Sequence, residues 1–219
     1  MGQIDKDQER EWLEPYRTAG EMLSADNPIQ RAGGIRILER IIKDSSSYRV
    51  AALESLADFL RYATRQERGA DSDQIPADIL AAVTALRRYP AEESVKMLNL
   101  RGAHFDHTDL SNINLRGADL TSSVLISTDF SGADLSGALL REANLTGADL
   151  TGAKLRGADL TRALLPSANL DGTDLTDCTL AEADFKYVDI STAIGLPPDL
   201  TGKSGDELWH AILRIQQNG

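Results

Sequence analysis

The side chains with the clearest chemical potential are two histidines and two aspartates close together in the sequence. His104 and His107 alternate with Asp106 and Asp109, and imidazole and carboxylate groups at short spacing are typical metal ligands. They stand, however, at the start of a repeat that leaves such positions turned outward. We therefore interpret the four residues as solvated surface and expect no bound metal and no cofactor.

No other combination of side chains is typical of an enzyme. A catalytic nucleophile needs a neighbouring base and a third group that orients the base, and the remaining histidine, His210, lies far along the chain. The sequence contains no G-x-x-x-x-G-K-[ST] phosphate-binding motif. Its single cysteine, Cys178, falls at a position that we expect to be buried, where a thiol is inert. We expect no enzymatic activity.

Composition excludes further classes of protein. The 219-residue chain has 34 acidic and 23 basic residues and a net charge of -11, which argues against direct binding of nucleic acid, because that affinity rests on Lys and Arg. A single cysteine excludes an internal disulfide and agrees with a reducing compartment. The longest apolar run, 79–83, is far shorter than the ~20 residues that cross a bilayer. The polar N-terminus does not resemble a signal sequence. We expect a cytoplasmic protein without membrane insertion.

An internal repeat dominates the second half of the chain. From Leu100 to Ile190 every fifth residue is large and apolar, which gives 19 consecutive positions with 15 Leu, three Phe and one Ile. The residue two before each is Ala in 11 cases, and the residue one before is Asp or Asn in 13. A period of five fits neither a helix nor a flat strand, so the chain must turn every five residues. If four pentads complete a coil, the large and small residues both fill the interior and leave no pocket.

This repeat resembles the motif of the pentapeptide-repeat family, which has a small residue, then Asp or Asn, then Leu or Phe, then two variable residues. Clear matches are 118–120, 133–135, 148–150 and 158–160, each of which reads Ala-Asp-Leu. The resemblance covers nearly half of the chain. It implies the fold of that family, a right-handed quadrilateral β-helix, here of about five coils because 19 pentads are present.

The flanking segments are expected to cap the β-helix, because both of its ends expose apolar side chains and backbone groups. Apolar periodicity predicts four helices, arranged as two hairpins, at 8–23, 28–44, 47–67 and 76–89. The stretch 31–41 resembles the helical, HEAT/armadillo-like module that precedes the repeats in a bacterial subgroup of the family. We expect a mainly β fold with α-helices, in three parts: a helical module at 1–96, a pentapeptide-repeat solenoid at 97–195, and a loop with a short capping helix at 196–219.

The last part contains a capping box, in which Ser204 is followed three residues later by Glu207. The helix that should follow has an apolar side made of Leu208, Trp209, Ile212 and Ile215. We favour a cap on the end of the β-helix. The alternative is a homodimer contact, since topoisomerase-binding relatives in the family pair through their C-terminal ends.

Two outward surfaces are candidate binding sites, because residues 20 apart should stack on one side of the coil. One side lacks Lys and Arg and carries a candidate acidic stripe of Asp109, Asp129, Asp149, Asp171 and Asp189. Another side, with one residue of the adjoining side, carries a candidate protein-binding patch of Val124, Ile126, Leu139, Leu164, Pro166 and Tyr187.

We interpret the chain as a non-catalytic scaffold for protein-protein interaction, with a protein partner that the sequence does not identify. The alternative, implied by the family resemblance, is a DNA mimic whose stacked carboxylates bind a type II topoisomerase, gyrase, at its DNA site. Two plainer readings stay open. Asp is preferred at this turn position without any partner, and the helical module or a terminal tail folds over the apolar patch.

Overall fold

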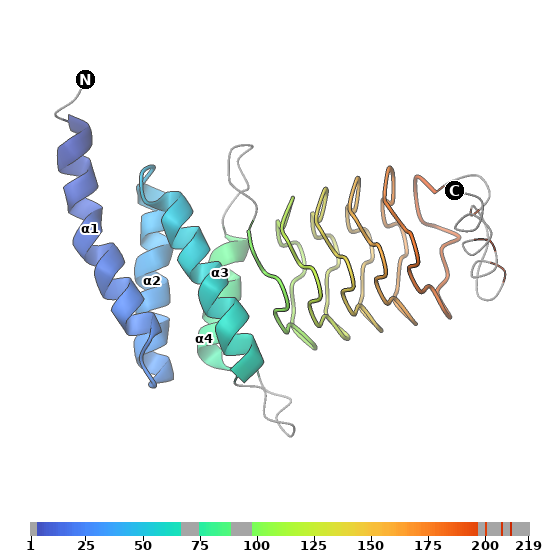
Figure 1. The fold of residues 1–219 in the computed structure, drawn as a ribbon, viewed down its shortest axis with the longest axis horizontal. Coiled ribbons are helices and arrows are strands. Elements are labelled where there is room, and N and C mark those ends of the chain that lie inside the picture. The colour runs from blue at the N-terminus through green and yellow to red at the C-terminus, as the bar shows by residue number, and fades with distance from the viewer. Residues whose placement is uncertain are drawn as a thin grey trace. The chain divides into compact units, whose positions relative to one another are not determined.

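The computed structural model describes residues 4–66, 75–88 and 98–196, together with residues 200, 207 and 211. The chain divides into two compact units, Met1–Leu98 and Asn99–Gly219, which are coloured from blue to green and from green to red in Figure 1. The expected apolar side of the C-terminal helix, with Leu208, Trp209, Ile212 and Ile215, lies outside the described residues.

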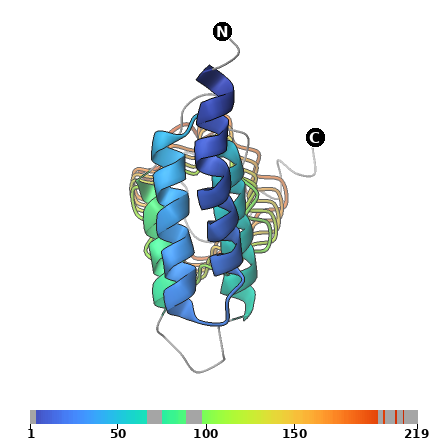
Figure 2. The same cartoon turned by 90° about the vertical axis from the view of Figure 1, so that its left-hand side faces the viewer.

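The described part of the first unit folds into four α-helices. They are α1 (Ile4–Leu23), α2 (Pro28–Asp44), α3 (Arg49–Gln66) and α4 (Ala77–Arg87), and they lie side by side (Figure 2). The expected bounds hold for α2, because Asn27 caps its N-terminus by accepting a hydrogen bond from the Ile29 backbone N–H at 2.8 Å. Helix α1 begins four residues before the expected start, in a polar stretch where apolar periodicity gives no signal.

Large apolar side chains of α2, α3 and α4 form the core of this unit. The least exposed of them, at 2% or below, are Ile35, Leu38, Ile41, Leu53, Leu56, Leu60, Ile79 and Val83. Helix α1 approaches α2 closely at Gly34, where an added Cβ would lie 2.9 Å from the Ala19 carbonyl oxygen. None of the helices in the described part of the chain is both long enough and apolar enough to span a membrane.

In the second unit the chain winds in coils of 20 residues (Figure 1). Parallel β-bridges join residues 20 apart, from Asn99 and Asp119 to Asp174 and Ile194, so four pentads complete each coil. Hydrogen bonds run in both directions along the axis. The Leu125 N–H donates to the Asn144 carbonyl at 2.8 Å, toward the next coil, and the N–H of Val124 donates to the carbonyl of the coil before it. The unit is therefore a β-helix solenoid, which we call the rod.

Each pentad turns at the second residue after its central Leu, Phe or Ile. Eight of these positions hold Gly, with φ between 60° and 68°, and ten hold other residues with positive φ, of which Tyr187 at 62° is the bulkiest. The Asp or Asn before the central residue stabilises the turn, as when Asp129 Oδ1 accepts a hydrogen bond from the Ser131 N–H at 2.8 Å. The preference for Asp and Asn therefore has a local structural cause.

The interior of the rod is filled by side chains. Every central residue from Leu100 to Leu175 is at most 2% exposed. The Thr128 hydroxyl, at a small inward position, donates a hydrogen bond to the Phe105 carbonyl at 2.7 Å. Cys178, which we expected to be buried, is half-buried, and it lies in the last of the stacked coils that the structure describes. Burial still raises the pKa of its thiol to about 12, which keeps the sulfur protonated and unreactive.

Candidate interaction surfaces

The structure places the candidate metal ligands His104 and His107 in the first coil of the rod. His104 is half-buried and His107 is exposed, and within the described ranges no three His, Cys, Asp or Glu side chains gather around one point. A groove of about 700 Å³ in the helical unit is lined by residues of α1, α2 and α3. Its charged side chains include Arg31 and Asp58, and each of them is held in an ion pair. The surface of the rod therefore becomes the main candidate.

One side of the rod carries most of the predicted apolar patch, and we call it the apolar side. Its central residues are Phe105, Leu125, Leu145, Leu165 and Phe185. The residues before and after each central residue face outward in the pairs His104 and Asp106, Val124 and Ile126, Asn144 and Thr146, Leu164 and Pro166, and Asp184 and Lys186. Bridges from His104 through Val124, Asn144 and Leu164 to Asp184 stack these pairs in order. Apolar pairs thus occupy the second and fourth coils, with a polar pair between them.

The predicted patch is not one continuous surface. Leu164 is 43% exposed and Tyr187 is 69% exposed, whereas Val124, Ile126 and Pro166 are half-buried. Leu139 belongs to the adjoining side, where its bridge partners are Asp119 and Asp159. Five of the six predicted residues therefore share one side, and Leu139 stands apart between carboxylates.

Tyr187 is held in a conformation that disfavours a bulky side chain. It occupies the turn position with φ of 62°, where eight equivalent positions carry Gly. Its ring is largely exposed, and the Lys186 ammonium lies 5.0 Å from the ring centroid. This contact is on the surface and contributes little to the core, and nine other turn positions also hold a non-Gly residue at a similar φ.

The acid side, with central residues Leu110, Phe130, Leu150, Leu170 and Ile190, carries the predicted acidic stripe. Asp109, Asp129 and Asp149 are successive bridge partners, and the next position in the column is Asn169. Asp171 lies two residues further along the coil and accepts a hydrogen bond from the Thr192 hydroxyl at 2.9 Å. The stripe is therefore a column of three stacked carboxylates, and Asp171 and Asp189 lie beyond Asn169.

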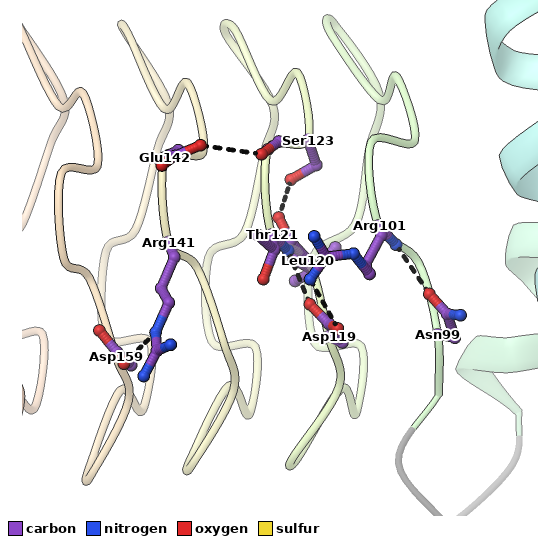
Figure 3. Close-up of polar contacts among 10 residues, drawn as sticks. Asn99, Arg101, Asp119, Leu120, Thr121, Ser123, Arg141, Glu142 and Asp159 are labelled. Atoms are coloured by element: carbon purple, nitrogen blue, oxygen red, sulfur yellow. Dashed lines mark hydrogen bonds and ion pairs between the residues drawn. The ribbon is translucent and has the colours of Figure 1, made fainter.

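A third side is lined by two arginine-aspartate pairs that we did not predict (Figure 3). Its central residues are Leu100, Leu120, Leu140, Leu160 and Leu180. Arg101 Nη1 lies 3.3 Å from Asp119 Oδ2, and Arg141 Nε lies 2.5 Å from Asp159 Oδ2. Both pairs join residues 18 apart, from the position after one central residue to the position before the central residue of the next coil. An Arg and an Asp 18 apart in a 20-residue period is the signal that could have revealed them.

The carboxyl groups of Asp119 and Asp159 have lowered pKa values, and the arginines are one of several causes. Burial is the largest influence on Asp119 and acts to raise its pKa, but hydrogen bonds from Thr121 and the pairing with Arg101 outweigh it, so the pKa lies below 3.8. Asp159 has the same balance, with Thr161 and Arg141 as its partners. The charged forms of both carboxylates are therefore stabilised by folding.

The rod is expected to lose stability in acid. A carboxyl group whose pKa is lowered by folding contributes stability above its unfolded pKa, and the contribution disappears as the pH falls through the folded pKa. Urea denaturation should therefore give a constant free energy of unfolding between about pH 7 and pH 5 and a decreasing one below about pH 4. Replacing Asp159 with Asn should make the acid loss shallower, and an equally steep loss would contradict this assignment.

The helical unit holds a buried ion pair that sequence reasoning also missed. Arg31 Nε lies 2.6 Å from Asp78 Oδ2, with side chains 11% and 0% exposed. Arg31 Nη1 also donates hydrogen bonds to the carbonyls of Ala25 and Asp26. The pair thus links α2 to α4 and to the turn after α1. Its members are 47 residues apart, and no repeat relates them, so the sequence holds no simple signal for it.

Comparison with known proteins places the repeat among described families. A family model for pentapeptide repeats matches in eight copies, over residues 99–137, 128–165 and 158–194. No protein of curated function matches the chain. The matches to the family model are confined to the rod.

Two of the similar solved structures, Rfr23 and alr5209, are pentapeptide repeat proteins. Rfr23 from the cyanobacterium Cyanothece 51142 is 36% identical over 44% of this chain and 63% of its own, with a TM-score of 0.38. The chain thus spans less than two thirds of that protein. The protein alr5209 from Nostoc PCC 7120 is 32% identical over 43% of this chain and 79% of its own, with a TM-score of 0.38. QnrB1, a plasmid-mediated fluoroquinolone resistance protein, is 19% identical over 59% of this chain and 76% of its own, with a TM-score of 0.28.

Proposed function

Since the chain belongs to the pentapeptide-repeat family, we propose that it acts without catalysis as a scaffold for protein-protein interaction, through the apolar side of its rod. The observation that carries this proposal is the contrast between the filled interior and Leu164 and Tyr187 outside it, at 43% and 69% exposure. A rod without internal space can act on other molecules only through its surface. Single exposed apolar side chains are ordinary, but a cluster of them rimmed by polar groups often marks a protein contact.

Tyr187 adds independent support. Its ring is 69% exposed and is not used in the core. The ring therefore adds apolar surface to this side of the rod.

The proposal includes finer features. The family resemblance implies a right-handed, four-sided coil, the capping box of Ser204 and Glu207 favours a short C-terminal helix that caps it, and the composition favours a location in the cytoplasm. The single cysteine supports the reducing location.

Replacing both Val124 and Leu164 with Asp should abolish association with the partner and leave the circular dichroism spectrum unchanged. Neither side chain belongs to the filled core, but both would place charge on the apolar side. The measurement is capture of partners from a lysate of the source organism, followed by mass spectrometry. A matched control replaces Asn169 and Thr179 with Asp, which adds the same charge at exposed bridge positions on two other sides. If the Val124 and Leu164 variant captures the partner as well as the control variant does, the proposal is contradicted.

A second candidate function is binding of a type II topoisomerase as a DNA mimic. The observation that favours it is the unbroken column Asp109, Asp129 and Asp149 on a side without Lys or Arg. One oxygen of each carboxylate is occupied by its turn hydrogen bond, at 2.8 to 2.9 Å.

A gyrase supercoiling assay tests this candidate. A DNA mimic should inhibit or protect the enzyme, and the effect should weaken with salt. The decisive variant replaces Asp129 and Asp149 with Asn, because Asn169 already shows that Asn keeps the turn hydrogen bond, at 3.1 Å, while losing the charge. If the native chain has no effect, or if the variant acts as strongly, the column serves only the turns.

A further inference from the structure

We infer that the partner of the apolar side is a second copy of this chain, bound antiparallel with its own apolar side facing the first. This inference rests on the proposed function and names the occupant of the same surface. The observation behind it is that the order of side chains along this side reads the same in chemical character from either end.

The third coil is the centre of this symmetry. Its outward residues are Asn144 and Thr146, and Asn144 is bridged to Val124 on one side and to Leu164 on the other. Consider a two-fold axis that lies midway between two copies and runs parallel to the extended segment from Asn144 to Thr146. It places the third coil of one rod opposite the third coil of the other. It places the second coil on the fourth and the first on the fifth.

The apolar pairs meet in this arrangement. Val124 lies opposite Leu164 of the other copy and Ile126 lies opposite Pro166, so apolar side chains cover one another on both sides of the axis. The two side chains also differ in how far they project from the rod, so one can pack against the other. Leu164 is 43% exposed, while Val124 is half-buried. Burial of these side chains supplies the attraction.

The charged pairs at the two ends are complementary as well. Asp106 in the first coil lies opposite Lys186 in the fifth coil of the other copy, and His104 lies opposite Asp184. The exposed ring of Tyr187 lies opposite His107, which occupies the same turn position in its own coil. Asn144 and Thr146 meet their own copies at the axis, where amide and hydroxyl groups can exchange hydrogen bonds. Among the residues directly before and after the central residues, no like charges are brought together.

A parallel pairing is the competing arrangement, and in it the two facing sides are less complementary in shape. With the rods parallel, each coil would face itself, so Val124 would lie opposite Ile126 and Leu164 opposite Pro166. The projecting residues Leu164 and Tyr187 would then meet the same end of the other rod and force the two sides apart at that end. The antiparallel pairing sets the projecting end of each rod against the flatter end of the other.

The size of the surface determines how tight the pairing can be. Five coils spaced by about 4.8 Å give a length of about 24 Å, and three extended residues give a width of about 10 Å. The footprint of about 240 Å² on each copy is below that of stable dimers, which bury ~1,200 Å² or more in total. We therefore expect a reversible dimer with a dissociation constant above about 1 µM.

Sedimentation equilibrium of the full chain, from about 10 µM to about 1 mM, tests the inference. The native chain should form a reversible dimer. Replacing Val124 with Asp, or Leu164 with Lys, should weaken it at least about tenfold, because each leaves a charge against an apolar side chain. The two changes together should restore it, since the new carboxylate at position 124 then faces the new ammonium group at position 164 of the other copy. A mixture of the two single variants should associate more tightly than either alone. Asn169→Asp, on the acid side, is the control and should change nothing.

A crosslinking experiment reports the register directly. Thr146 lies on the proposed axis, so Thr146→Cys should be joined to its own copy by a bis-maleimide of about 8 Å, a length suited to sheets packed ~10 Å apart. Thr151→Cys is the matched control, because Thr151 has the same place in its pentad and the same hydrogen bond to the preceding Asx residue. Cys178 should not react, because burial raises the pKa of its thiol to about 12.

The outcomes separate this inference from the proposed function. A native chain that stays monomeric at about 1 mM, or a carboxylate–ammonium double variant that fails to recover, overturns the antiparallel dimer. If the variant that carries Val124→Asp and Leu164→Asp together fails to capture another protein that the native chain captures, the scaffold is still upheld. If the native chain stays monomeric and the variant with Val124→Asp and Leu164→Asp still captures the same proteins, both the dimer and the scaffold are overturned.

Discussion

Replacing Leu165 with Ala should lower the free energy of unfolding of the rod by about 2–5 kcal/mol. The Leu165 side chain is 0% exposed, and the same column holds Leu145 and Phe185 in the coils on either side, at 0% and 1%. The truncated side chain leaves a cavity that the stacked coils cannot close, because hydrogen bonds between the coils fix their spacing. Urea-dependent amide exchange, followed in peptides from the rod, measures the loss.

The neighbouring residue is the matched control. Leu164 has the same side chain and the same sequence neighbourhood, but it points outward and is 43% exposed. Leu164→Ala should change the free energy of unfolding by less than about 0.5 kcal/mol, although it removes part of the proposed contact surface. Comparable losses for the two variants would mean that the side chains share one environment, which would contradict the alternation on which the rod depends.

Replacing Asp78 with Ala should destabilise the helical unit by about 3–5 kcal/mol. The Asp78 side chain is fully buried, and its Oδ2 lies 2.6 Å from Arg31 Nε, so its removal leaves a guanidinium largely without water and without its carboxylate partner. Helical circular dichroism during urea denaturation of the full chain reports this loss, because the described helices lie in this unit.

Two further variants isolate the buried charge as the cause. Asp58 pairs with Arg61 at the surface, with side chains 65% and 32% exposed, so Asp58→Ala should cost less than about 1 kcal/mol. Adding Arg31→Met to Asp78→Ala should recover part of the loss, because it removes the unpaired charge. A double variant as unstable as the sum of the two single variants would show that lost packing, and not charge, is responsible.

The rod shows how far a sequence can determine a structure. Each coil contacts the coils 20 residues before and after it, so contacts in space follow directly from a spacing in the sequence. The inward positions, the turn position and the absence of room inside the rod could all be predicted from the period of five. The acidic column of Asp109, Asp129 and Asp149 followed from the same spacing.

The sequence was less informative about how much of each outward side chain reaches solvent. Val124 and Leu164 have equivalent places in their pentads, yet only Leu164 projects strongly. Cys178 occupies an inward position but is half-buried, because it lies in the last of the stacked coils that the structure describes. Neighbouring side chains and coil ends decide these differences, and they do not follow from the period.

The amino-acid sequence alone determined the family of the chain, the course of the rod and the four helices before it, since all of these arise from local or strictly periodic patterns. Only the tertiary structure decided that Arg31 reaches Asp78 and that Arg101 and Arg141 hold aspartates of the next coil. The physical reason for the Arg31 pair is that helix packing brings together residues that no regular spacing relates, whereas the two pairs on the rod depend on side-chain directions that the period alone does not fix. The same side-chain directions give the apolar side the symmetric order from which its partner was inferred.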